Sequence, residues 1–119
     1  MARYVDGFVI PIPKKNLAAY RRMARAGAKI WKDHGAVEYR ECVGDDLKNK
    51  WGVPFGKLAK VKPGETVVFS WIVFKSKADR KKVNAAVMKD PRVRKMMTES
   101  PPFDMKRMAY GGFIVLVDQ

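Results

Sequence analysis

The sequence contains only one cysteine, Cys42, and only one histidine, His34. A single cysteine excludes an internal disulfide and gives no sign of an oxidising compartment, so we expect a cytoplasmic protein. One histidine and one cysteine also fall short of the three or four ligands of a zinc site, so we expect no metal. Cys42 lies in a predicted strand, where a thiol in the core is favoured over a reactive nucleophile.

Long apolar runs are missing as well. No segment has the roughly 18 consecutive apolar residues that a membrane-spanning helix needs, so we expect no membrane partner. The first apolar run, FVIPIP at 8–13, follows Asp6 and has no small-residue cleavage site after it. It therefore reads as part of a strand and not as a signal peptide.

Acidic residues are scarce: 12 Asp and Glu stand against 25 Lys and Arg, which gives a net charge of +13. The excess is distributed along the chain, which excludes a basic tail. It fits either a highly charged, solvated surface or a polyanionic partner such as nucleic acid. The candidate polyanion-binding residues lie on the polar faces of two predicted helices: Arg22, Arg25, Lys29, Lys32, Lys77, Lys81 and Lys82.

Length and hydrophobic periodicity predict a single domain over residues 1–119. Apolar patterns of strand type indicate four strands, at residues 3–11, 36–44, 65–75 and 106–117. Patterns of period 3.6 indicate a helix at 14–33 and a second helix that begins at Ser76, which forms a capping box with Asp79. A further helical turn is expected after Pro91.

The resulting order β-α-β-β-α-β predicts an α+β protein of ferredoxin-like topology, with a four-stranded antiparallel sheet and both helices on one face. The strand at 65–75, ETVVFSWIVFK, is apolar on both faces, whereas the two helices cover only one face of the sheet. An uncovered apolar face would exceed what a monomer normally exposes, so we expect a homodimer closed through the sheet face. Trp51 and Phe55, in the long connection 45–64, are candidates for a lid or for a dimer contact.

Four long stretches together cover nearly the whole chain: YVDGFVIPIPKKNLAAYRRMA at 4–24, IWKDHGAVEYRECVGDD at 30–46, ETVVFSWIVFKSKADRKKVNAAVMKDPRV at 65–93 and PFDMKRMAYGGF at 102–113. In these stretches the sequence resembles the YbaA-like bacterial proteins of unknown function, within the dimeric α/β-barrel superfamily. The resemblance implies a ferredoxin-like fold, a dimeric α/β barrel and a ligand cleft between sheet and helices. It implies no reaction and no cofactor, so no catalytic residue follows from it.

Five polar residues in apolar elements are candidates for binding a ligand: Asp6, His34, Tyr39, Glu41 and Arg107. Asp6 interrupts the first strand, and Arg107 on the last strand is its expected partner, either in an internal ion pair or in a ligand site. His34 is either a general base or haem ligand, or a helix-terminal residue favoured by the macrodipole. Tyr39 and Glu41 share one side of the second strand, where they either bind a ligand or pair across the sheet edge.

Two functions are therefore expected, in this order, ahead of a third, a stress or assembly protein whose dimer surface is the active feature. The first is a small-molecule-binding dimer, with a candidate enzymatic activity in the cleft between sheet and helices. The second is a non-catalytic dimer that binds RNA or another polyanion through its basic helix faces, although no strand carries an aromatic-and-basic RNA-recognition motif. No pattern in the sequence assigns a substrate or a cofactor.

Overall fold

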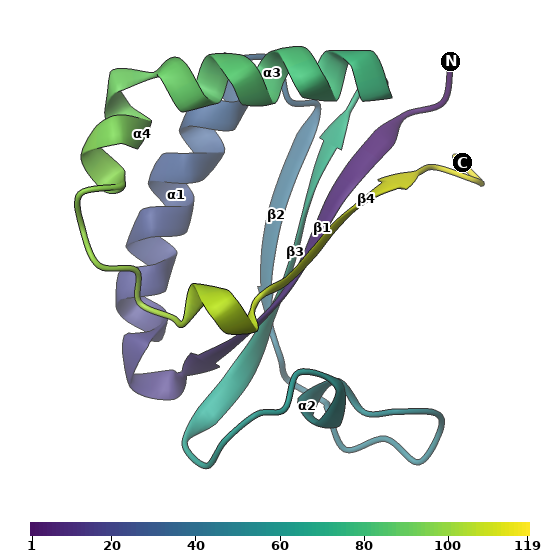
Figure 1. The fold of residues 1–119 in the computed structure, drawn as a ribbon. Helices are drawn as coiled ribbons and strands as arrows, with labels where there is room; N and C mark the ends of the chain where they lie inside the picture. Colours follow the sequence, from purple (N-terminus) through teal and green to yellow (C-terminus); the bar gives the residue numbers. More distant parts are fainter.

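The computed structural model describes residues 1–119 and contains one four-stranded antiparallel sheet (Figure 1). Its strands are β1 (Tyr4–Pro13), β2 (Glu38–Val43), β3 (Glu65–Phe74) and β4 (Ala109–Ile114). Their order across the sheet is β2-β3-β1-β4, so β1 and β3 are central and β2 lies at an edge, as its polar residues predict. This arrangement confirms the predicted α+β class and its ferredoxin-like topology.

The main helices all lie on one face of this sheet (Figure 1). They are α1 (Leu17–Asp33), α3 (Lys77–Lys89) and α4 (Pro91–Met96), with short 3₁₀ turns η1 (Lys14–Asn16) and η2 (Met105–Arg107). The Ser76 hydroxyl accepts a hydrogen bond from the Asp79 backbone N–H at 3.0 Å, which confirms the predicted start of α3. Asp90 caps α4 in the same way, through the Arg92 backbone N–H at 2.8 Å. No helix of the protein combines the length and the apolar character that crossing a membrane requires.

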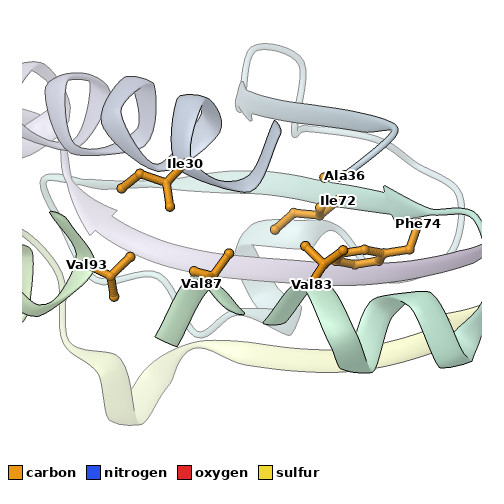
Figure 2. Close-up of a cluster of buried hydrophobic side chains, with 7 residues drawn as sticks. All are labelled: Ile30, Ala36, Ile72, Phe74, Val83, Val87 and Val93. Carbon is orange, nitrogen blue, oxygen red and sulfur yellow. The ribbon is translucent and has the colours of Figure 1, made fainter. Parts of the chain in front are cut away.

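The hydrophobic core lies between these helices and the sheet. Its largest cluster joins α1, β3, α3 and α4 through Ile30, Ala36, Ile72, Phe74, Val83, Val87 and Val93 (Figure 2). A second cluster packs the first half of α1 on β1 and β3, through Ile10, Ile12, Tyr20, Ala24 and Val68. Truncating a large core side chain to alanine typically costs about 2–5 kcal/mol, so these clusters fix the position of α1 on the sheet.

Strand β1 continues through Pro11 and Pro13, where the sequence predicted its end. Its pairing with β4 stops at the Val9–Ala109 pair, while its pairing with β3 continues to Pro13. The Lys14 N–H donates to the Gly64 carbonyl on the β3 side, so the nitrogens of the two prolines point to the other side, beyond Ala109, where β4 begins. The missing proline N–H groups therefore cost no ladder hydrogen bonds.

Two further boundaries differ from the prediction. The last strand is shorter than 106–117, because Met105–Arg107 form the η2 turn before β4 begins. The connection 45–64 contains one short helix, α2 (Phe55–Leu58). This connection extends away from the body of the protein at the end of the sheet where β3 begins (Figure 1).

The sheet face opposite the main helices, which we call the open face, is apolar. Directly paired strand residues share a face, which places Val9, Phe69, Trp71 and Phe113 on the open face. Helix α2 packs on it, with the Phe55 ring centroid 5.8 Å from that of Phe69. Phe69 and Phe113 nevertheless remain 44% and 61% exposed. The protomer thus covers only part of the face that the pattern of β3 predicts to be buried.

Candidate functional site

An open groove runs between α1 and the edge strand β2, and we call it the α1–β2 groove. Its volume is about 870 Å³. Tyr39 and Glu41 of β2 line it, because their partners on β3, Ile72 and Ser70, also face the helices. The remaining walls are largely apolar and include Leu17, Ala24, Ala28, Val43 and Val68. Its volume falls in the range of known small-molecule sites.

Three of the residues that line the groove are hydrogen-bonded to one another, and we call them the Tyr–Glu–Tyr cluster. The Tyr20 hydroxyl donates to Glu41 Oε1 at 2.6 Å, and the Tyr39 hydroxyl donates to Glu41 Oε2 at 2.8 Å. Burial raises the pKa of both tyrosines, and the adjacent carboxylate of Glu41 raises it further. Both phenols therefore stay protonated at neutral pH and direct their protons to Glu41.

Gly27 of α1 lets Tyr39 lie close beneath the helix. A Cβ atom at position 27 would be 3.1 Å from the Tyr39 hydroxyl oxygen, which is tighter than an ordinary contact. Trp31, one turn further along α1, packs on the same tyrosine with ring centroids 6.2 Å apart. The missing side chain at position 27 thus sets the place of the Tyr39 hydroxyl in the cluster.

Asp6 lies outside the groove, buried between β1 and α3. Its Oδ1 atom lies 2.8 Å from Arg80 Nη2, and its Oδ2 atom accepts a hydrogen bond from the Asn84 amide at 3.2 Å. The expectation that Arg107 pairs with Asp6 is therefore wrong. Arg80 and Asn84 are four residues apart on α3, so the same face of that helix delivers both partners to the carboxylate.

Arg107 pairs with Glu65 instead. It belongs to η2 and not to the last strand, and its guanidinium donates to both carboxylate oxygens of Glu65, at 2.7 and 2.8 Å. These hydrogen bonds lower the pKa of Glu65 to about 2. A further bond to the Lys60 carbonyl, at 2.9 Å, ties η2 to the connection before β3. Arg107 therefore joins two segments of the fold, away from the groove.

His34 lies in a contact between α1 and α4. Its Nε2 atom is 2.8 Å from Asp90 Oδ2, which also accepts a hydrogen bond from the Arg92 guanidinium at 2.8 Å. The hydrogen bonds from Arg92, and then that from His34, lower the pKa of Asp90 well below its usual range.

No three His, Cys, Asp or Glu side chains gather in a metal-binding arrangement. Of the five predicted ligand residues, the structure brings only Tyr39 and Glu41 together.

The predicted polyanion-binding residues are all exposed on the helix layer: Arg22, Arg25, Lys29, Lys32, Lys77, Lys81 and Lys82. They do not form one uniform surface. Arg22 and Arg25 line the α1–β2 groove together with Arg21, which the pattern did not single out. Lys29 forms an ion pair with Asp33 at 3.7 Å, whereas Lys77, Lys81 and Lys82 of α3 form none.

Sequence reasoning also missed Tyr20 and misplaced Cys42. Tyr20 occupies an apolar position of α1, so the helical pattern assigns its ring to the core, where it is buried. Its second role, the hydrogen bond from its hydroxyl to Glu41, follows from the tertiary structure and not from the helical pattern. Cys42 was expected in the core, but it is exposed, because it pairs with Phe69 and so belongs to the open face.

Comparison with known proteins identifies the family. Residues 3–105 match the family described as Protein of unknown function (DUF1428). The chain belongs to the DUF1428 family. The Uncharacterized protein YbaA of Escherichia coli strain K12 is 43% identical over 117 residues, which cover 98% of this chain and 99% of that protein. YbaA of Shigella flexneri matches to the same extent, and the predicted resemblance is confirmed.

The fold of this DUF1428 chain also occurs in a solved structure. The crystal structure of a dimeric ferredoxin-like protein from an uncultured marine organism matches with a TM-score of 0.62 and 11% identity, and 100% of both chains is covered. At this identity the likeness shows the fold alone.

Proposed function

We propose that this DUF1428 protein is a homodimer that binds a small organic molecule in the α1–β2 groove. The Tyr–Glu–Tyr cluster is the observation that carries the proposal. It places a carboxylate and two phenols, hydrogen-bonded to one another, in the lining of a groove whose other residues are mainly apolar. A few convergent polar groups in an apolar pocket are how proteins orient small ligands.

Within this cluster, Glu41 is the residue suited to accept a proton or a hydrogen bond from the bound molecule. Its two oxygens already accept one bond each from Tyr20 and Tyr39, which hold it in position and leave further lone pairs free. A carboxylate held within reach of a substrate hydroxyl or acidic C–H is a general base. Asp6 and Arg107 have no part in this site, because each is paired elsewhere.

Glu41→Gln is expected to weaken ligand binding in the groove at least tenfold, which corresponds to about 1.4 kcal/mol. The amide keeps the shape of the side chain but loses the charge and one acceptor oxygen. Hits from a small-molecule library screened by ligand-observed NMR against the wild-type protein are titrated into the variant. Glu99→Gln is the matched control, because it removes the same charge at an exposed position outside the groove. Hits that bind both variants and the wild type equally would show that the ligand site lies elsewhere.

The dimer contact that we propose is formed by the open face. Besides Phe69 and Phe113, which are 44% and 61% exposed, Leu58 of α2, the helix that packs on this face, is 60% exposed. Apolar side chains in such number around one sheet face favour burial against a second copy. The solved ferredoxin-like neighbour is described as dimeric, which agrees with this assembly. A contact through the open face leaves the groove of each protomer accessible, since the groove lies on the other side of the sheet.

A second candidate function, RNA or polyanion binding, is favoured by the charge of the helix layer. Helices α1, α3 and α4 carry thirteen Lys and Arg but only two acidic residues, Asp33 and Asp79.

Binding of a labelled RNA of mixed sequence is expected to weaken at least tenfold between about 50 and 200 mM salt, as measured by fluorescence anisotropy. Lys81→Glu/Lys82→Glu on α3 is expected to weaken it further, whereas Lys57→Glu/Lys60→Glu, outside the helix layer, is the control. Absence of binding at the lowest salt, or equal losses in both variants, would contradict this function.

A further inference from the structure

Three arginines along the groove have no partner within the protein. Arg21, Arg22 and Arg25 line the groove from α1, and all three are exposed. None of them forms an ion pair with an acidic side chain, in contrast to Arg80 and Arg107, which a carboxylate holds in place. The groove therefore presents three guanidinium groups that are free to bind something else.

Glu41, the acidic residue that lines the groove, does not neutralise these arginines. Its oxygens accept the hydroxyl protons of Tyr20 and Tyr39, at 2.6 and 2.8 Å, and no arginine lies within ion-pair distance of it. Three positive charges thus stand against one negative charge along the groove. Such an imbalance in a partly enclosed site raises the local concentration of anions.

We infer that the groove takes an organic anion: a molecule with a carboxylate or phosphate at one end, an apolar body and a hydrogen-bond donor at the other end. The inference rests on the proposed function, because it names the ligand class of the same site. Guanidinium groups bind carboxylate and phosphate oxygens in a bidentate fork, which assigns the anionic end to the arginines. The apolar body matches Leu17, Ala28 and Val68 on the groove walls.

The third feature of the ligand follows from the direction of the hydrogen bonds in the Tyr–Glu–Tyr cluster. The phenol protons of Tyr20 and Tyr39 are used on Glu41, so the cluster offers acceptor lone pairs to the groove and no free donor. A ligand group that reaches the cluster therefore has to donate a hydrogen bond, as a hydroxyl or an amine does. A ligand with an acceptor alone at that end would leave buried lone pairs facing one another.

The test compares 4-hydroxyphenylacetate with its uncharged amide, with phenylacetate, which lacks the hydroxyl, and with phenyl phosphate. Probes of this size are expected to bind with roughly millimolar affinity. They are titrated into the isotope-labelled full chain, and amide chemical shifts are followed by NMR. We expect shifts concentrated on residues 17–28 and 38–43, and at least fivefold tighter binding of the hydroxylated acid than of its amide. Phenylacetate is expected to bind more weakly than the hydroxylated acid.

Arg21→Gln/Arg25→Gln is expected to abolish the preference for the acid over the amide. Lys81→Gln/Lys82→Gln removes the same charge from α3 and is expected to preserve that preference. Equal affinity of acid and amide at the groove would overturn the inference and leave the proposed function standing. Shifts from the acids that spread evenly over α3 and α4 would also overturn it, as unspecific attraction to the helix layer. If none of the probes moves the groove resonances, the inference and the proposed ligand site both fail.

Discussion

Replacing Phe69 by glutamate is expected to leave the protein folded and to separate it into monomers. Phe69 lies on the central strand β3, in the middle of the open face, with its ring 5.8 Å from Phe55 and 5.5 Å from Trp71. In a dimer closed through this face, the substitution places a carboxylate from each protomer in an apolar contact without partners. Burying such charges is costly, so we expect dimerisation to weaken at least about 100-fold, or roughly 3 kcal/mol.

Sedimentation velocity over a concentration series measures this change, and circular dichroism checks the fold. Phe69 is 44% exposed in the protomer, so its replacement leaves both core clusters intact. Met88→Glu is the matched control: Met88 is 50% exposed on α3, on the helix side of the sheet, and this variant is expected to remain dimeric. A wild-type protein that is monomeric at micromolar concentration, or a Phe69→Glu variant with unchanged dimerisation, would show that the open face is not the contact.

The open face also shows which part of the fold can be read from the sequence. Side chains of a strand alternate between two faces, so the run from Val67 to Phe74 is enough to infer that both faces of β3 are apolar. The same reasoning predicts the helices, whose apolar positions recur every three or four residues. Helix α2 escapes such reasoning, because four residues are too few to show a period. The extension of β1 through Pro13 escapes it too, because it depends on where β4 begins.

Only part of the candidate site could be predicted from the sequence, because the rest depends on tertiary contacts. Tyr39 and Glu41 are two residues apart on one strand, so alternation alone places them on the same side. Their meeting with Tyr20 depends on how α1 crosses β2, which no local pattern contains. The need of Asp6 for a cationic partner was likewise predictable from its apolar surroundings, but the identity of that partner was not. Arg80 reaches it because the first turns of α3 lie over β1.

Arg80→Met is expected to be strongly destabilising, with a loss of about 3–5 kcal/mol of unfolding free energy. The variant leaves the Asp6 side chain, which is only 3% exposed, without its positive partner. Methionine keeps the apolar stem that lies beside Tyr4, whose ring centroid is 5.3 Å from the guanidinium carbon, so the main loss is that of charge. Chemical denaturation followed by circular dichroism gives the difference. Arg3→Met, in the exposed pair with Asp118 at 3.6 Å, is the control and should cost under about 1 kcal/mol.

The double variant Asp6→Asn/Arg80→Met separates the loss of an attraction from the burial of an unpaired charge. Asparagine is neutral and still accepts the hydrogen bond from Asn84, so the double variant is expected to regain at least half of the stability that Arg80→Met loses. A double variant no more stable than Arg80→Met would show that the stem or the Tyr110 bond of Arg80, at 2.7 Å, matters more than the charge of Asp6.

Neither Asp6 nor Arg80 lines the α1–β2 groove, although Asn84 also accepts a hydrogen bond from Trp31 at 3.0 Å, and Trp31 packs on Tyr39. The folded fraction of either variant should therefore bind groove ligands as the wild type does. A loss of that binding would show that the Asp6 network and the groove are coupled, through Asn84 and Trp31.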